Sequence, residues 1–265
     1  MRNPVKYLAV SSLLSWAILV APPPCRSAEP DVQTIIEKSV EANQLDFKAA
    51  PQFTHREQDR TGSGSKTFQV LMIDGSPYRR LIAVNDEPLP ANAAQQEEEK
   101  LEQAKSERKA ESSGRRQRRI AKYEKERRRN NAMMQELTKA FTFHLIGECK
   151  LDSFDVYKLE AKPRPGYNPP NLETQVLPAM EGQLWIDKVS YQWVKVTAKV
   201  IRPASIEGFL AQVEPGTQFE LEKMPVGGGV WLPKHFAMKS QAKVLFLVNQ
   251  NSHEDDTFFD YHRVP

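Results

Sequence analysis

The stretch EGQLWIDKVSYQWVKVTAKVIRP, residues 181–203, decides the fold class. Its first half is apolar and favours a strand, Asp187–Ser190 supplies a polar corner, and Tyr191 restarts the extended pattern. Beyond the corner, one row of alternate residues is predicted to face the core and the other row to face water. The predicted core row is Gln192, Val194, Val196, Ala198 and Val200. The stretch therefore predicts an antiparallel hairpin with one apolar face.

Further strands are predicted wherever apolar and polar residues alternate between turn residues. Their ranges are 53–60, 66–73, 78–84, 141–146, 154–161, 208–213, 217–224, 230–239, 243–248 and 257–264. About 11 strands are expected in one antiparallel meander, and an open twisted sheet of that size curls. The predicted fold is therefore mainly β (α+β): a curved antiparallel half-barrel with lid helices and a long charged helical insertion.

The first 28 residues are predicted to be a cleaved secretory signal peptide. Arg2 and Lys6 precede an apolar core, Leu8 to Val20, which is too short to span a membrane. Without Arg2, Lys6 and Arg26, the chain has 34 basic and 34 acidic residues, so its net charge indicates no polyanionic partner. We expect export to the periplasm of a Gram-negative-type bacterium and one domain over residues 29–265.

Two regions predict helices. Residues 30–47 place apolar residues on one side, and such a helix can pack on the sheet or cover a ligand. Residues 91–139 form the predicted helical insertion, because they are rich in Ala, Glu, Lys, Arg and Gln. From Glu97 to Arg129 there are 13 basic and 8 acidic residues, a net charge of +5.

Seven arginines concentrate the charge of the insertion. They are Arg115, Arg116, Arg118, Arg119, Arg127, Arg128 and Arg129. The insertion is either a solvated projecting helix or a docking element for an anionic membrane surface or an acidic envelope protein. No nucleic-acid partner is expected, since aromatic or groove-reading elements do not accompany the arginines.

Residue spacing offers no catalytic or metal-binding motif. The five histidines, at 55, 144, 235, 253 and 262, lack the spacing of metal ligands, and the chain has no G-x-S-x-G nucleophile motif. Gly227–Gly229 precedes a predicted strand, whereas a phosphate-binding loop precedes a helix. We therefore expect a binding protein with no cofactor and no metal, not an enzyme.

Apolar side chains of the sheet are then the candidate ligand-binding groups. The chosen residues are Phe68, Val70, Met72, Leu184, Ile186, Val194, Val196 and Phe236. The pattern leaves open which face is concave, because a shift of register by one residue moves every side chain to the other face.

Five sequence segments resemble the LolA/LolB-like lipoprotein-carrier superfamily, in particular the longer outer-membrane lipoprotein-sorting relatives. They are RRLIAVNDEPL at 79–89, FHLIGE at 143–148, KPRPGY at 162–167, EGQLWIDKVSYQWVK at 181–195 and GGVWLPKHF at 228–236. The resemblance implies a half-barrel of about 11 strands, lidded by helices, whose hydrophobic cavity holds acyl chains. The arginine that controls lipoprotein hand-over in the characterised carrier has no match here, and the long insertion is not a feature of that carrier.

Two functions follow as hypotheses. The first is a non-catalytic carrier or sensor that binds lipid or lipoprotein acyl chains in the half-barrel. The second is an envelope interaction module that docks an acidic partner or a membrane surface through its basic helical arm. A hydrolase with a site assembled from distant residues is the third and weakest hypothesis, because no nucleophile–base pair is evident.

Overall fold

The predicted hairpin forms around a corner shaped by Asp187. In the computed structural model, which describes residues 31–206, 211–244 and 248–264, β7 (Met180–Asp187) pairs with β8 (Trp193–Val200). The Asp187 carboxylate accepts hydrogen bonds from the backbone N–H and the hydroxyl of Ser190, both at 2.7 Å. Tyr191 lies in the left-handed region at φ 57°, so the second strand begins at Trp193, two residues later than predicted.

The described strands all belong to one antiparallel sheet, which confirms the predicted fold class. Eleven of them follow one another in the order β4-β3-β2-β1-β13-β12-β11-β8-β7-β6-β5. Their bounds are β1 Phe53–Thr61, β2 Gly64–Ile73, β3 Ser76–Val84, β4 Glu87–Pro88, β5 Phe141–Leu151, β6 Phe154–Pro163, β11 Gln218–Gly227, β12 Val230–Val244 and β13 Val248–Arg263. Two short strands, β9 (Ala204–Ile206) and β10 (Ala211–Val213), continue the pairing from β12.

The first and last strands of the chain pair in the middle of the sheet. β1 pairs with β13, so Phe53 lies opposite Arg263. β12 and β13 are longer than predicted, because each pairs continuously where the sequence indicated turns near residues 240 and 251–256. Parts of the predicted strands 208–213 and 243–248, and the whole predicted signal peptide 1–28, lie outside the described residues.

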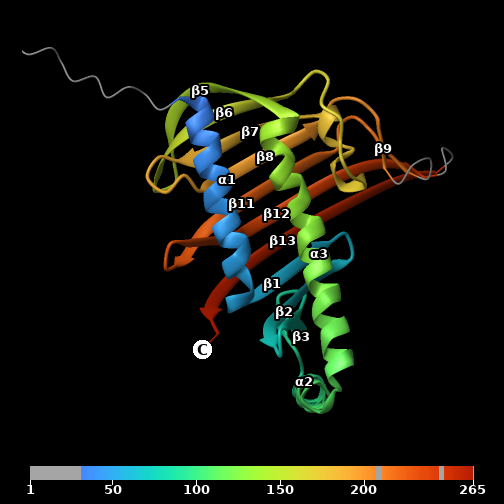
Figure 1. The fold of residues 1–265 in the computed structure, drawn as a ribbon. Coiled ribbons are helices and arrows are strands. Elements are labelled where there is room, and N and C mark those ends of the chain that lie inside the picture. Colours follow the sequence, from blue (N-terminus) through green and yellow to red (C-terminus); the bar gives the residue numbers. More distant parts are fainter. Residues whose placement is uncertain (1–30, 207–210, 245–247, 265) are drawn as a thin grey trace, which may run out of the picture. The chain divides into compact units, whose positions relative to one another are not determined.

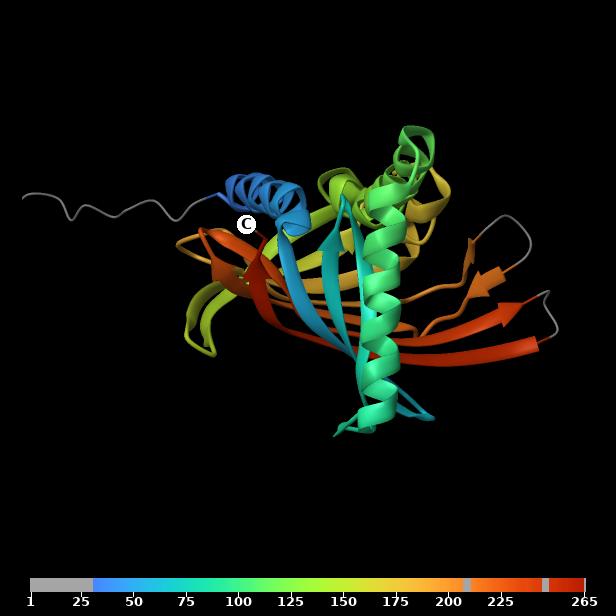
Figure 2. The same ribbon diagram turned by 90° about the horizontal axis from the view of Figure 1, so that it is seen from below.

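Three helices accompany the sheet: α1 (Val32–Ala49), α2 (Ala91–Ala110) and α3 (Ser113–Ala140). The sheet curves around α1 and the C-terminal part of α3, which pack on the same face (Figure 1; Figure 2). Ser112 separates α2 from α3 and caps α3, because its hydroxyl accepts a hydrogen bond from the Arg115 N–H at 3.4 Å. Short 3-10 turns occur at Ala50–Gln52, Leu172–Thr174 and Leu177–Ala179.

The main hydrophobic core lies between these helices and strands β5 to β8. Ile35, Leu159, Leu177 and Ile186 are almost fully buried there. The described helices include none that combines the length and the apolar composition needed to cross a bilayer.

Candidate functional site

One row of side chains crosses the helix-facing side of the sheet. The directly opposed residues, from β6 to β1, are Leu159, Leu184, Val196, Leu221, Phe236, Asp256 and Asp59. Opposed residues on antiparallel strands point to the same side, so the row shares one face. It is apolar at its β6 end and acidic at its β1 end.

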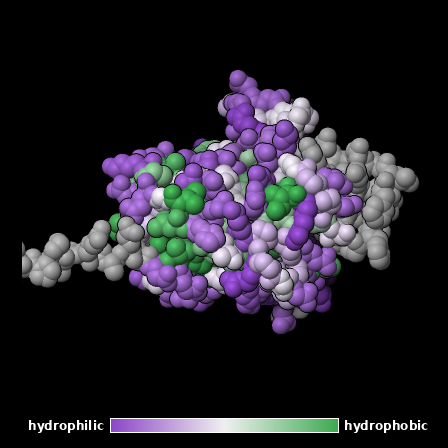
Figure 3. Space-filling view, turned by 90° about the horizontal axis from the view of Figure 1, so that it is seen from above, coloured by the Kyte–Doolittle hydropathy of each residue, from purple (hydrophilic) through white to green (hydrophobic). Residues whose placement is uncertain are grey.

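Helices fill the β6 end of this face. Leu184 and Ile186 are buried in the core cluster that includes Ile35 and Ile36 of α1, and Met133 of α3 packs against the same cluster. Leu184 is 4% exposed and Ile186 is completely buried. In this conformation these two candidate residues contact the helices and leave no room for a ligand. Seen from the β5–β6 side, the surface is mostly hydrophilic with separate apolar patches (Figure 3).

A buried polar cluster fastens the end of α1 to the sheet. The Lys223 ammonium donates hydrogen bonds to Asp46 at 2.5 Å and to Asn43 at 2.7 Å. Asp46 also accepts from the Gln192 side chain at 3.1 Å and from the Trp231 backbone N–H at 2.9 Å. The Lys223 and Asp46 side chains are only 7% and 5% exposed. We call Asn43, Asp46, Gln192 and Lys223 the α1 clamp.

Two opposite effects act on the pKa of Lys223 in the clamp. Burial lowers the pKa of Lys223, and the adjacent Asp46 carboxylate acts in the opposite direction. Because both charged groups are desolvated and fully hydrogen-bonded, removing one partner leaves the other in a poor environment. The clamp therefore fixes the position of α1 over the sheet.

The other end of the helix-facing side is formed by β11, β12, β13, β1 and β2, and it carries half-buried apolar side chains. They are Leu221, Phe236, Phe258 and Phe68, which lie outside the helix-packed core cluster. Register places Phe68 on this face, since it is opposite Glu57, which in turn is opposite Phe258. We call these four residues the open apolar surface.

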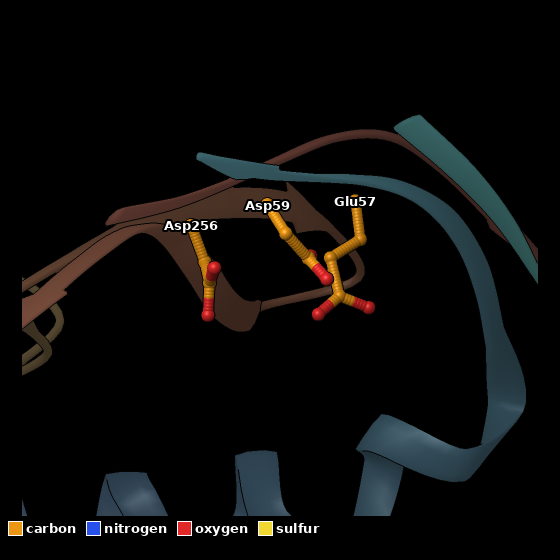
Figure 4. A group of neighbouring side chains, drawn as sticks. All are labelled: Glu57, Asp59 and Asp256. Carbon is orange, nitrogen blue, oxygen red and sulfur yellow. The ribbon is translucent and has the colours of Figure 1, made fainter. Parts of the chain in front are cut away.

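Three carboxylates adjoin the open apolar surface. Glu57 and Asp59 come from β1 and Asp256 from β13, and all three point to the side on which α1 lies (Figure 4). One oxygen of each lies within 4.8 Å of the others, so the group could hold a cation. The Asp59 Oδ1 atom is buried and accepts no hydrogen bond from a described residue.

Arg79 of β3 partly neutralises this acidic group. Its guanidinium forms ion pairs with Asp59 at 2.7 Å and Glu57 at 3.4 Å, and it lies 4.0 Å from the centre of the Phe68 ring. The side chain thus joins the charged and apolar parts of the site.

The carboxylates and a neighbouring imidazole have shifted pKa values. Burial, reinforced by the charges of Asp59 and Glu254, raises the pKa of Asp256 to about 7. Burial also raises the pKa of Glu57, and Arg79 opposes this effect. The His55 ring stacks on Tyr261, and burial together with the Arg79 charge lowers its pKa to about 4. The site therefore holds a neutral imidazole beside carboxyl groups that resist ionisation.

Two hollows differ in chemistry. A cavity of about 410 Å³ lies beside Asp59, Lys66, Phe68 and Val84 on the helix-facing side. A groove of about 490 Å³ lies on the opposite side of the sheet, where its lining includes Glu181, Lys199 and Glu220. The lining of the second hollow mixes charged side chains with apolar ones such as Phe219 and Ala237, whereas the first adjoins Phe68 beside Asp59 on the helix-facing side.

The structure brings most of the predicted ligand-binding residues onto one face but not Val194. Val196, Leu184 and Ile186 face α1, and Phe68, Val70, Met72 and Phe236 lie on the same side at the open end. Val194 packs on the opposite side with Val156 and Trp231. The predicted common face for Val194 and Val196 is therefore wrong. A β-bulge opposite Trp185–Ile186 inserts one residue, so Trp193 enters the core instead.

The seven arginines of the insertion also divide. Arg119 donates hydrogen bonds to Ser76 at 2.6 Å and to Asp74, and it pairs with Glu111. Arg127 lies 4.3 Å from the Phe47 ring centre and pairs with Glu124 at 2.8 Å. These two residues hold α3 on the body of the protein, so their predicted docking role is wrong for this conformation. The exposed arginines are Arg115, Arg116, Arg118, Arg128 and Arg129.

Sequence reasoning missed both the α1 clamp and the carboxylate group. The clamp joins residues up to 180 positions apart, and Asp256 meets Asp59 only because the first and last long strands pair. No local motif encodes either arrangement. The sequence signals for them were weak. Asp46 is an acidic residue near the end of the predicted apolar helix, and the carboxylates are isolated charges within predicted strands.

The chain is similar to several solved structures at low sequence identity. No protein-family model matches the chain, and no curated protein matches it. The chain is similar to the structure of a putative outer membrane lipoprotein-sorting protein domain from Vibrio parahaemolyticus, with 13% identity over 86% of this chain and 93% of that chain and a TM-score of 0.32. It is also similar to a LolA superfamily protein from Nitrosomonas europaea, with 11% identity over 89% and 94% of the two chains and a TM-score of 0.33.

A third similar structure is MucB in complex with MucA, with 9% identity over 89% and 100% of the two chains and a TM-score of 0.26. At these identities and TM-scores, the likenesses do not themselves assign a family, and the fold class rests on the sheet described above.

Proposed function

We propose that the protein binds an acyl chain of a lipid or of a lipid-modified protein on the helix-facing side of its sheet. It acts as a non-catalytic carrier or sensor in the periplasm of a Gram-negative-type bacterium. The observation that carries this proposal is the open apolar surface, because Leu221, Phe236, Phe258 and Phe68 lie on the curved face beside α1 but outside its packed core.

Apolar transfer supplies the expected affinity. Each methylene of an acyl chain that leaves water contributes about 0.8 kcal/mol. The four side chains also lose their own contact with water when a chain covers them. The three carboxylates lie between Phe68 and Phe236 within this surface, and together with Arg79 they are suited to orient a polar headgroup.

Under this proposal the chain has three parts: a signal peptide, a carrier domain and a helical insertion within that domain. A signal peptide, residues 1–28, directs export and is removed. Residues 29–265 form the carrier domain, and residues 91–139 are an insertion within it. The seven arginines of that insertion at positions 115, 116, 118, 119, 127, 128 and 129 have no role in acyl binding under this proposal.

Native mass spectrometry of protein purified without detergent tests the proposal first. An adduct with the mass of a phospholipid or fatty acid, lost on denaturation, is the expected result. Titration with a fluorescent fatty acid then measures affinity for chains that escape purification.

Adjacent substitutions on one strand locate the site. Phe236 faces the α1 side and Ala237 faces the outer groove, so Phe236→Asp should abolish fatty-acid binding and Ala237→Asp should leave it unchanged. Circular dichroism confirms that both variants fold. The opposite pattern would move the site to the outer groove, and no binding of any lipid by the unmodified protein would reject the function.

A further inference from the structure

The exposed side of α3 carries a straight stripe of cationic side chains. The stripe consists of Arg115, Arg118, Lys122, Lys125 and Arg129, and all five residues are exposed. Their spacing of three, four, three and four residues repeats every two turns, which keeps them on one side of an α-helix. At 1.5 Å per residue the stripe is about 21 Å long. We call these five residues the α3 stripe.

The opposite side of the same helix segment attaches α3 to the rest of the protein. Ile120 lies against Gly75, Arg119 bonds to Ser76, and Arg127 stacks on Phe47. The α3 stripe is therefore held pointing away from the sheet, along a helix that stands at the surface (Figure 2).

The α3 stripe consists of cations that are exposed and lie in one line along the helix. None of its five side chains forms an ion pair with any described residue, and Glu126 is the exposed acid beside it. Three other cations of α2 and α3 are paired within the helix, namely Lys100 with Glu97, Lys105 with Glu102 and Lys139 with Glu136. Lys109, Arg116 and Arg128 are exposed and unpaired among the described residues as well, but they lie outside the line of the stripe. Residues 113–129 hold nine basic and two acidic residues, a net charge of +7.

We propose that the α3 stripe docks the protein on the surface of an anionic lipid membrane. A protein interface needs apolar or aromatic anchors that fill pockets, and the stripe contains none. A charged lipid surface needs only cations presented side by side, and each Lys or Arg near it raises affinity roughly fivefold. This inference does not depend on acyl binding by the sheet.

Vesicle co-sedimentation of the full chain tests the inference. Vesicles contain phosphatidylcholine alone or with about one-third phosphatidylglycerol. Binding is expected only to the anionic vesicles and should weaken strongly between about 0.05 M and about 0.5 M salt, because salt screens exposed charges. Replacing all five stripe residues with glutamine should weaken binding by about 100-fold or more.

A matched variant removes the same charge elsewhere on α2 and α3. It replaces five exposed cations with glutamine: Lys105, Lys109, Arg116, Arg128 and Lys139. Retained binding by this variant supports the α3 stripe, whereas an equal loss would show attraction by net charge alone and overturn the proposal. Failure of the unmodified chain to bind anionic vesicles would also overturn it. Binding to immobilised poly-glutamate in that case would assign the stripe to an acidic protein.

Discussion

Removing Asp46 should destabilise the protein by about 4 kcal/mol. In Asp46→Ala the Lys223 ammonium stays buried and keeps Asn43 as its close acceptor. Breaking a buried ion pair by deleting one partner costs about 3–5 kcal/mol. The Trp231 N–H also loses its acceptor, for which about 1–3 kcal/mol is typical. The two effects are not additive, because water that enters the site can solvate both groups.

Urea unfolding followed by circular dichroism measures this loss. Asp46→Asn keeps an oxygen for Trp231 and should lose less, about 2–3 kcal/mol. The double variant Asp46→Leu with Lys223→Met removes both charges and should recover much of the stability. Lys199→Met is the control, because its partner Glu181 lies at 2.9 Å on the surface and the pair is worth less than about 1 kcal/mol.

Either of two results would show that Asp46 and Lys223 do not fasten α1 to the sheet. A loss below about 1 kcal/mol for Asp46→Ala would mean that the pair is solvated and does not fasten α1. Strict additivity in the cycle of Asp46 and Lys223 variants would mean that the two groups do not interact. The variants and the unmodified protein must have the same m-value in urea, since this shows that unfolding exposes the same surface in each.

Asp256 has a raised pKa of about 7, so the native state holds a proton that the unfolded state releases between about pH 4 and pH 7. After allowance for solvent screening, the free energy of unfolding should therefore fall by about 1–2 kcal/mol as pH rises through this window. Asp256→Asn should remove this pH dependence. Coincident unfolding curves of the unmodified protein at several pH values would contradict the prediction. Gly182→Ala should cost about 2 kcal/mol or more in urea unfolding, because the added Cβ would lie 2.5 Å from a backbone oxygen of β8, and a neutral effect would show that the strands can separate. Arg127→Ala should cost about 1–2 kcal/mol by releasing Phe47, whereas Arg128→Ala, on the exposed side, should change stability by less than about 0.5 kcal/mol; equal effects in thermal unfolding would place α3 differently.

Local sequence was sufficient for most of the fold. Alternating residues defined the strands, and the corners at Asp74–Gly75 and Asn85–Asp86 adopt the positive φ values that those residues tolerate. The longer course of β12 and β13 was not predictable locally, because polar residues near 240 and 251–256 are held in strands by pairing with each other.

The candidate site was less predictable because it depends on register between distant strands. Val194 and Val196 alternate correctly in sequence, yet a bulge decided by pairing with β7 turns Val194 to the other face. Likewise, Arg119 and Arg127 look like any other arginine of the insertion until the fold places Ser76 and Phe47 beside them.

The structure divides the helix-facing side of the sheet into two halves with different requirements for a ligand. A chain on the open apolar surface displaces only water. A chain that reaches Leu184 and Ile186 must displace α1 and so break the α1 clamp, at about 4 kcal/mol, in addition to exposing Ile35 and Ile36. At about 0.8 kcal/mol per methylene, five further methylenes offset the clamp alone. A short chain is therefore confined to the open half, and only a chain of acyl-lipid length can open the covered half. The clamp thus sets a minimum chain length for any ligand that uses the whole face.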